Sequence, residues 1–144
     1  MSRNFVVALM LFGGCAASLL CQEKAGNSVW DGVYTDQQAA RGETGYSSSC
    51  ASCHGKALEG RGQTPPLAGT DFTANWNDRP LDDLFEKIQD SMPADRPGQL
   101  SRPQNAAVLA YILKSNKFPA GSAELSTEAD ALKRIRFDAE RPAR

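Results

Sequence analysis

Hydrophobic residues recur with helical spacing in the middle of the chain. Leu81, Leu84, Phe85 and Ile88 follow the i, i+3, i+4, i+7 rule, which predicts an amphipathic helix with one buried face. This helix is expected to end before Met92-Pro93, because a proline disfavours helical geometry in the residue that precedes it. The pattern therefore predicts a loop after this helix.

A second helix is predicted beyond that loop. Val108 and Tyr111 fall on one face, and Ser101 with Gln104 forms a capping box at the expected first turn. The helix is expected to end by Lys117, because a proline and a glycine follow shortly after it.

An earlier helix is predicted to begin near Thr35. Thr35 and Gln38 fit a capping box, which marks a helix start. Ala39, Gly42 and Tyr46 then share one face at i, i+3 and i+7. We expect this helix to run up to or into a pair of cysteines that follows it.

Glycine and proline separate these helices, so residues 56–66 and 94–100 are expected to be loops. The sequence shows no internal repeat and no convincing alternation of apolar and polar residues. The chain is therefore expected to be all-α, with a few helices in one domain.

The N-terminal segment has the composition of an export signal. Arg3 supplies a positive start, residues 5–12 are uniformly apolar, and the first carboxylate comes only at Glu23. We expect cleavage near Cys21, so residues 1–21 are predicted to be a signal peptide and the mature protein to be periplasmic.

Two alternatives for this segment stay open. Gly13-Gly14-Cys15 resembles a lipoprotein box, which would place a lipid anchor on Cys15 and tie the protein to a membrane, although Phe12 is unusual before such a box. The segment also reaches the short end of the range for a membrane-spanning helix that stays uncleaved.

Composition suggests three further boundaries. Residues 22–32 are polar and contain glycine, which is typical of a linker. Residues 33–121 contain the predicted helices and form the expected domain. Residues 122–144 are rich in charge and are expected to form a C-terminal tail.

The predicted tail combines charges with a few large apolar residues. Ser126 and Glu128 can start a short helix, and Leu132, Ile135 and Phe137 follow. We expect the tail to lie on the surface of the domain, where it either clasps the domain or forms a docking surface for a partner.

The chain has 144 residues and a formal net charge of −1. This length suits one small domain with peripheral segments. The chain has no excess of basic residues, so its composition does not favour binding to nucleic acid. Of the four cysteines, Cys15 and Cys21 lie in or beside the predicted signal. Only Cys50 and Cys53 are left, so no disulfide framework is expected.

The run Cys50-Ala51-Ser52-Cys53-His54 is the attachment signature of a c-type haem. Its two thiols can add to the two vinyl groups of the haem, and the imidazole of His54 then reaches the iron. A thioredoxin-like redox pair would require a βαβ context, which the predicted helices do not supply. A zinc site needs about four ligands, whereas this run offers two thiolates and one imidazole.

Candidate axial ligands follow from the scarcity of suitable residues. His54 is the one histidine in the chain, so it is expected to bind the iron and no second histidine is available. Met1 and Met10 lie in the predicted signal, which leaves Met92 as the expected second ligand, in a loop stiffened by Pro93. The alternative role for Met92 is a flexible core residue.

The chain resembles the class I c-type cytochromes over residues 33–118. The resemblance is carried, in order, by the helix with Gly42 and Tyr46, the Cys50–His54 run, Pro65-Pro66-Leu67-Ala68-Gly69, Met92-Pro93, and the helix that ends in residues 109–113. It implies a cytochrome c fold, in which a few helices wrap one covalently bound haem, followed by a C-terminal extension.

The resemblance also implies roles for several residues. In this family the carbonyl of the first proline of the loop, here Pro65, accepts a hydrogen bond from the proximal imidazole and fixes its orientation. Gly42 is implied to let the first and last helices cross closely, with Tyr46 packed near Tyr111.

Further residues are implied to contact the haem itself. Trp76 is implied to donate its indole N–H to a haem propionate, as a tryptophan does in some relatives, and packing in the core or on the surface is an equal alternative. Leu67 is implied to line the haem. Other large apolar residues implied to do so are Phe72, Leu81, Phe85 and Ile88.

The resemblance extends to small periplasmic cytochromes, and cytochrome modules, that work with quinoprotein dehydrogenases. It implies an electron carrier, not an enzyme by itself, with one covalent haem c ligated by His54 and Met92. Expected partners are periplasmic redox proteins, with a quinoprotein dehydrogenase as donor and a terminal oxidase as acceptor. Two other classes stay open: a haem enzyme or gas sensor with an open sixth site, and a docking subunit of a dehydrogenase that binds through its tail.

Overall fold

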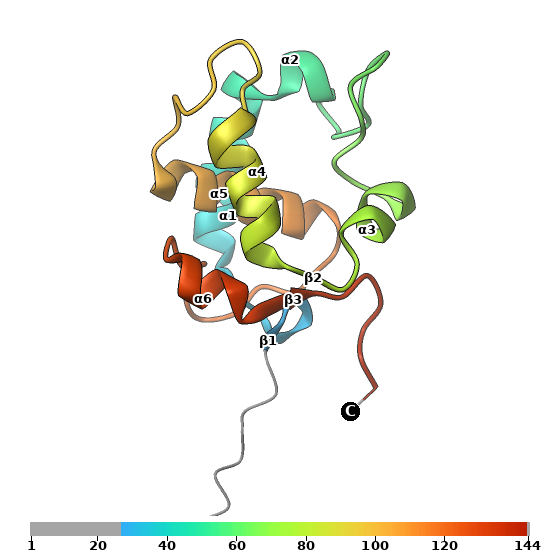
Figure 1. Ribbon diagram of the computed structural model, residues 1–144, viewed down its shortest axis with the longest axis vertical. Coiled ribbons are helices and arrows are strands. Elements are labelled where there is room, and N and C mark those ends of the chain that lie inside the picture. Colours follow the sequence, from blue (N-terminus) through green and yellow to red (C-terminus); the bar gives the residue numbers. More distant parts are fainter. Residues whose placement is uncertain (1–26, 144) are drawn as a thin grey trace, which may run out of the picture.

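The computed structural model describes residues 27–143, which form a mostly helical fold with a small sheet (Figure 1). The predicted signal peptide, residues 1–21, and the alternative lipid site at Cys15 lie outside these residues. Between residues 27 and 143, no helix has both the length and the apolar character that a membrane crossing requires. The elements follow in the order β1 (Asn27–Ser28), η1 (Val29–Asp31, a 3₁₀ helix), α1 (Asp36–Ser49), α2 (Ala51–His54), α3 (Thr70–Trp76), β2 (Arg79–Pro80), α4 (Leu81–Ser91), α5 (Arg102–Ser115), α6 (Ala129–Lys133) and β3 (Ile135–Phe137).

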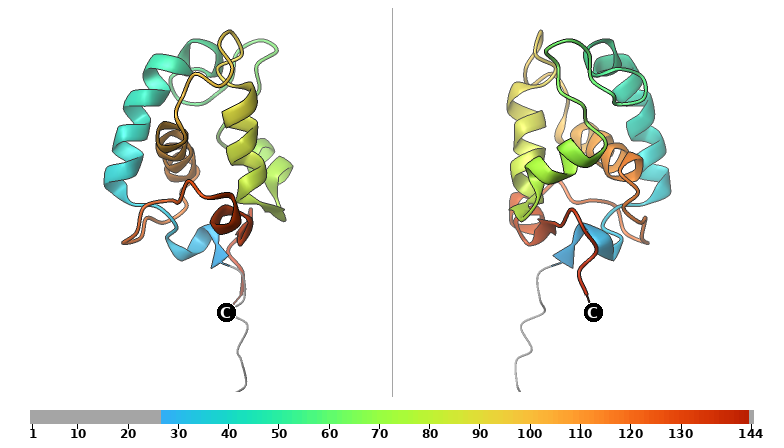
Figure 2. Two further views of the ribbon diagram at one scale, coloured as in Figure 1. Left: turned by 60° about the vertical axis from the view of Figure 1, so that its left-hand side comes forward. Right: turned by 90° about the vertical axis from the view of Figure 1, so that its right-hand side faces the viewer.

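The crossing of α1 and α5 forms the centre of the fold (Figure 2). At Gly42 the two backbones lie so close that a Cβ atom would overlap the carbonyl oxygen of Ala107. Only glycine fits there without moving one of the helices. One turn further along α1, the ring centroids of Tyr46 and Tyr111 lie 5.3 Å apart. Both contacts agree with the helix crossing expected from the sequence.

The start of α1 is capped as predicted, but only in one direction. The Thr35 hydroxyl oxygen accepts a hydrogen bond from the Gln38 amide N–H at 3.1 Å. The Gln38 side chain does not return to the cap. It instead binds the backbone of Leu125, donating to the carbonyl oxygen at 3.0 Å and accepting from the amide at 2.7 Å.

Helix α4 begins and ends where the hydrophobic spacing predicts. It buries its Leu81, Leu84, Phe85 and Ile88 side chains and reaches its C-cap at Met92. Helix α5 follows after the predicted loop, and its capping box is formed by a hydrogen bond from the Ser101 amide to the Gln104 side chain at 2.9 Å. These two helices and α1 were all predicted from the sequence.

Helix α3 was not predicted. It has seven residues, and Phe72 is its only buried residue, so it offers too few apolar positions to show a period. Tertiary contacts stabilise it instead: the Phe72 ring centroid lies 6.4 Å from that of Trp76 and 6.0 Å from that of Phe137.

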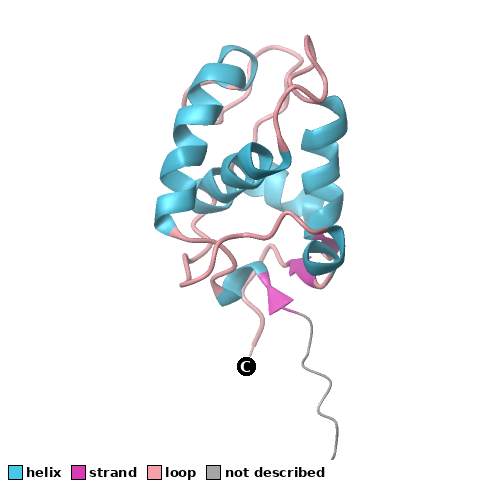
Figure 3. Ribbon diagram, turned by 90° about the vertical axis from the view of Figure 1, so that its left-hand side faces the viewer, coloured by secondary structure: helices cyan, strands magenta, loops and turns pink. Residues whose placement is uncertain are grey.

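Residues of the predicted tail complete the core. The side chains of Leu125, Leu132, Ile135 and Phe137 are all buried. Strand β3 lies between β1, to which it is parallel, and β2, to which it is antiparallel. Figure 3 shows these strands together at one end of the molecule. The tail therefore does more than lie on the surface, because it joins two distant segments of the chain in a sheet.

Residues 27–32 belong to the packed structure, although they fall in the segment predicted as a linker. Val29 is fully buried, and the Trp30 indole N–H donates to the carbonyl oxygen of Asp138 at 2.9 Å. Gly32 and Gly121 touch through their backbones, and a Cβ at Gly121 would overlap the Gly32 carbonyl oxygen. The linker prediction for residues 22–26 lies outside the described residues.

Candidate functional site

The two cysteines and the histidine share one turn of chain. Cys50 caps both the end of α1 and the start of α2, and its carbonyl oxygen accepts from the amides of Cys53 at 3.1 Å and His54 at 2.9 Å. Both cysteines are free thiols, with Cys50 half-buried and Cys53 exposed, while His54 is buried. The turn therefore presents two thiols beside a fixed imidazole.

The position of α2 is set by a contact with α1. The Tyr46 hydroxyl donates to the carbonyl oxygen of Gly55 at 2.6 Å. Burial is the main cause that raises the pKa of Tyr46 well above its ordinary value, so the phenol stays protonated and remains a donor. Gly55 ends α2 with a φ of +83°, a conformation that favours glycine.

His54 is oriented by the loop that follows α2. Its Nδ1 lies 2.9 Å from the carbonyl oxygen of Pro65. A carbonyl oxygen only accepts, so Nδ1 carries the proton in this contact and Nε2 of the neutral ring keeps its lone pair. The loop is held in turn by hydrogen bonds from the Gly60 amide to the His54 carbonyl at 2.7 Å and from the Leu67 amide to the Leu58 carbonyl at 2.9 Å.

Asn116 is a residue that sequence reasoning missed. Its side-chain amide donates to the carbonyl oxygen of Leu67 at 2.9 Å, and its side-chain oxygen accepts from the Gly69 amide at 3.0 Å. Asn116 is the C-cap of α5, so it ties the loop with Pro65 and Leu67 to the helix that crosses α1. The sequence does show an asparagine at the predicted end of this helix. Asparagine is common at helix ends, however, so its presence does not indicate contacts with a distant loop.

The Cys50 thiol does not have the character of a reactive or zinc-binding cysteine. Burial, with a smaller contribution from Cys53, raises the pKa of the Cys50 thiol to about 11. This thiol is therefore protonated at neutral pH, whereas reactive or zinc-binding cysteines are thiolates. In the described part of the chain, no group of three or more His, Cys, Asp and Glu residues is placed to hold a metal ion.

Met92 lies where α4 ends, and its amide donates to the Ile88 carbonyl oxygen at 3.0 Å. Its side chain is partly buried against the core, and the Pro93 that follows is buried. The end of α4 and helix α2 lie at the same end of the molecule in both Figure 1 and Figure 2. The structure thus brings the segments that carry His54 and Met92 to one end.

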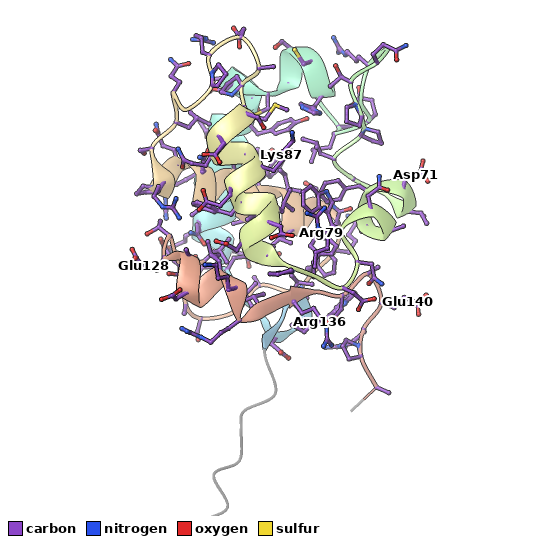
Figure 4. All side chains as sticks on the ribbon, in the orientation of Figure 1. Asp71, Arg79, Lys87, Glu128, Arg136 and Glu140 are labelled. Carbon is purple, nitrogen blue, oxygen red and sulfur yellow. The ribbon has the colours of Figure 1, made fainter. Side chains whose placement is uncertain are left out.

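Trp76 is the last residue of α3 and is partly buried. The Arg79 guanidinium carbon lies 4.6 Å from the centroid of its ring, and Figure 4 shows Arg79 between α3 and α4. The same guanidinium contacts Asp83 at 2.9 Å. Among the described residues, the Trp76 indole N–H has no hydrogen-bond partner. Arg79 was not singled out from the sequence.

The chemistry of these groups fits a covalently attached haem. Cys50 and Cys53 offer two sulfur atoms one helical turn apart, which suits two thioether bonds. His54 offers a nitrogen with a fixed lone pair, and Met92 offers a thioether, which are common axial donors for haem iron. Within residues 27–143, a zinc site would lack a fourth ligand.

Comparisons with known proteins agree with this reading of the fold. The family described as cytochrome C oxidase, cbb3-type, subunit III matches residues 37–112. Cytochrome c-554(547) of Halothiobacillus neapolitanus is 58% identical over 31 residues, which are 22% of this chain and 34% of that protein. This match therefore spans about a third of the relative's length.

A solved structure shows the same fold. The crystal structure of the sulfane dehydrogenase SoxCD from Paracoccus pantotrophus matches with a TM-score of 0.56 and 24% identity, over 75% of this chain and 61% of the matched chain. The likeness concerns the fold, and this chain spans less than two thirds of the matched one. The family match, in contrast, includes more than half of the 144 residues. The chain therefore belongs to the family of cytochrome c domains described as cytochrome c oxidase, cbb3-type, subunit III.

Proposed function

We propose that this protein carries single electrons on one haem c bound covalently to Cys50 and Cys53. The observation that carries the proposal is the 2.9 Å contact between His54 Nδ1 and the Pro65 carbonyl oxygen, on the same turn as both thiols. It leaves Nε2 available as a ligand whose orientation is already fixed. When bound, the haem supplies an iron that alternates between Fe(II) and Fe(III).

His54 and Met92 are the proposed axial ligands. The Pro65 oxygen accepts a hydrogen bond from Nδ1–H. This makes Nε2 a better electron-pair donor to iron and prevents rotation of the ring. The soft thioether of Met92 favours the reduced iron and so raises the reduction potential. With both positions filled by side chains, no site is left for a substrate, which is why we propose a carrier and not an enzyme.

Leu67 and Trp76 are proposed to bind the haem at its sides. Leu67 stays partly exposed on a loop that Asn116 holds in place, so its side chain is available for an apolar contact. The Trp76 indole N–H makes no hydrogen bond within residues 27–143, and the Arg79 guanidinium lies over its ring, a pairing suited to a propionate carboxylate. Replacing Trp76 with Phe is expected to keep the haem attached and to change its potential. An unchanged potential would assign Trp76 to packing alone.

The proposal is tested by producing the protein in a host that attaches haem c. The mass of the product is expected to include one covalent haem, and the ferric spectrum to show a methionine–iron charge-transfer band. Cys50→Ala with Cys53→Ala is expected to remove the covalent haem. A high-spin, five-coordinate ferric spectrum of the parent would instead support the haem enzyme or gas sensor with an open sixth site. A colourless product with free thiols would contradict both.

The same mass measurement tests the proposed location. A mature N-terminus near residue 22 supports export to the periplasm with cleavage of the signal, whereas a lipid adduct on Cys15 supports a membrane anchor. The proposed partners are periplasmic redox proteins, with a quinoprotein dehydrogenase as donor and a terminal oxidase as acceptor. Electron transfer is expected to require only a small, short-lived contact.

The docking-subunit alternative needs a test that leaves the fold intact. Deleting residues 122–144 would remove the buried Leu132 and Phe137 from the core, so a loss of partner binding would have no clear meaning. Lys133 and Arg134 are exposed on the same segment. Reversing both charges to Glu is expected to slow reduction by a dehydrogenase if the tail docks. Unchanged reduction kinetics would contradict that role.

A further inference from the structure

We propose that the side-chain amides of Asn105 and Gln89 hold the loop that carries Met92, and so determine how firmly Met92 stays on the iron. The inference rests on the proposed function, because it takes Met92 to be an axial ligand. It concerns two residues whose side-chain hydrogen bonds go to each other and to Leu100. They are therefore positioning residues, and their effect reaches the ligand through the loop of residues 92–100.

The amide pair joins three separate segments. Asn105 lies in the first turns of α5 and is fully buried, and its side-chain nitrogen donates to the Gln89 side-chain oxygen at 2.6 Å. Gln89 lies near the end of α4, and its side-chain nitrogen donates to the carbonyl oxygen of Leu100 at 3.2 Å. Leu100 ends the loop that begins at Met92. Two consecutive hydrogen bonds thus connect α5, α4 and the far end of this loop.

The loop has few other attachments. Residues 94–99 are all exposed, so burial does not hold them in place. A local hydrogen bond from the Arg96 amide to the Pro93 carbonyl oxygen, at 2.9 Å, shapes a turn but does not tie the loop to a helix. At its start, the Met92 amide completes the last hydrogen bond of α4. At its far end the loop passes into α5 at the N-cap Ser101, and the bond from Gln89 to Leu100 ties this end to α4 as well.

One polar atom of the amide pair is buried without a partner. The Asn105 side-chain oxygen is buried and has no hydrogen-bond partner among residues 27–143. A buried polar atom without a partner is unfavourable, and the neighbouring positions on α5 are filled by apolar residues such as Val108 and Leu109. An apolar residue could fill the position of Asn105 in the core. A role in positioning the loop therefore explains this asparagine better than a contribution to stability does.

The consequence for the site follows from the geometry of the loop. If the Gln89 bond is lost, Leu100 loses its hydrogen bond to α4, and the exposed residues 94–99 before it have no burial that holds them against that helix. Met92 would then leave the iron more often, and an added ligand could take its place. Affinity for such a ligand reports the fraction of molecules in which Met92 is displaced.

The test replaces the amide pair with apolar side chains of similar size in the haem-loaded protein. Gln89→Leu with Asn105→Leu removes both side-chain amides without adding a second methionine near Met92. The Leu100 carbonyl that loses its donor belongs to a partly exposed residue, so unfolding is expected to need about as much denaturant as in the parent. Imidazole affinity of the ferric protein is nevertheless expected to rise about tenfold or more, and the potential to fall. A purely structural role would change stability and leave imidazole binding as it is in the parent.

A second variant separates the two hydrogen bonds. Gln89→Glu keeps an oxygen that can accept from Asn105 but loses the donor to the Leu100 carbonyl, so it is expected to increase imidazole affinity as well. If the double variant does not fold, the imidazole affinity of Gln89→Glu tests the positioning role by itself. Thr35→Ala is the control, because it removes the cap of α1, away from the loop. It is expected to lower stability without changing imidazole affinity.

Two negative results have different meanings. If a folded variant shows the methionine–iron charge-transfer band and binds imidazole as weakly as the parent, the positioning role of Asn105 and Gln89 is wrong, while the proposed function stands. If the parent itself lacks that band, the ligation by Met92 is wrong, and the inference fails with it.

Discussion

Gln38 on α1 pairs with both backbone polar groups of Leu125, donating to its carbonyl oxygen at 3.0 Å and accepting from its amide at 2.7 Å. Both residues are 3% exposed. The Gln38 side chain therefore pairs both backbone groups of Leu125, as the backbone of a neighbouring β-strand would. This contact satisfies two backbone groups that would otherwise be buried without partners.

Gln38→Leu is expected to destabilise the protein by about 1–3 kcal/mol, because it leaves the amide and carbonyl of Leu125 buried and unsatisfied. The free energy of unfolding in denaturant measures this loss. Arg41→Ala is the matched control, since it breaks an exposed ion pair to Glu124 between the same two segments. It is expected to cost about 0–0.5 kcal/mol. Equal effects of the two variants would contradict the importance of the buried pair.

Gly42→Ala is expected to destabilise the protein by about 1–3 kcal/mol, because its Cβ would overlap the carbonyl oxygen of Ala107 and push α1 from α5. Thermal unfolding of the haem-loaded protein measures the change. Gly45→Ala lies on the same helix and meets only the Val108 side chain, at 3.3 Å. Because alanine favours helix over glycine by about 1 kcal/mol, this control is expected to be neutral or stabilising. A mild effect at Gly42 would mean that the crossing adjusts easily.

Met92→Leu and Met92→Ala are both expected to keep the haem attached, to lower the potential, and to let imidazole bind the ferric iron. The leucine variant is the stricter test, because it removes the sulfur while keeping a side chain of similar size. Spectroscopic redox titration gives the potential. If the leucine variant has the potential of the parent and only the alanine variant differs, then Met92 acts through packing and another group binds the iron.

Asp82 is expected to make stability depend on pH. Burial, followed by the carboxylate of Glu86, raises the pKa of Asp82 above its ordinary 3.8, against a smaller lowering by Lys133 and Arg102. The folded state therefore favours the protonated form. This contribution to stability is complete below pH 3.8 and is lost as the pH rises through the higher pKa of the folded state.

Asp82→Asn stays neutral at every pH, so it is expected to gain stability relative to the parent as the pH rises through that interval. Denaturant unfolding of both proteins between pH 4 and pH 7 measures the difference. Asp83→Asn is the control, because Asp83 is partly exposed and its ion pair with Arg79 is worth about 0–0.5 kcal/mol. A constant difference between parent and Asp82→Asn across this range would contradict the raised pKa.

The long helices were predictable because each repeats a pattern. Leu81, Leu84, Phe85 and Ile88 share one apolar face of α4, and local residues cap α1 and α5. The Cys50–His54 run was also predictable, since it is contiguous in the sequence. Such local signals identify an element or a motif without any knowledge of the rest of the fold.

Features that depend on distant partners were not predictable. Helix α3 is too short for a period and relies on Phe137, which lies 65 positions later than Phe72 in the sequence, for its packing. The strands have two or three residues each, so alternation cannot show in them. Asn116 gave only a common helix-end signal, and its role appears from its contacts with the loop.

Strands β1 and β3 lie in one sheet, at the end of the molecule away from α2 (Figure 1). Strand β1 and the C-terminal end of the described chain therefore both lie at the pole opposite α2 (Figure 1). A membrane tether or a second domain attached at either end would hold the protein at this pole. The turn with Cys50 and Cys53 would then face outward, free to meet a redox partner in any direction that the tether allows.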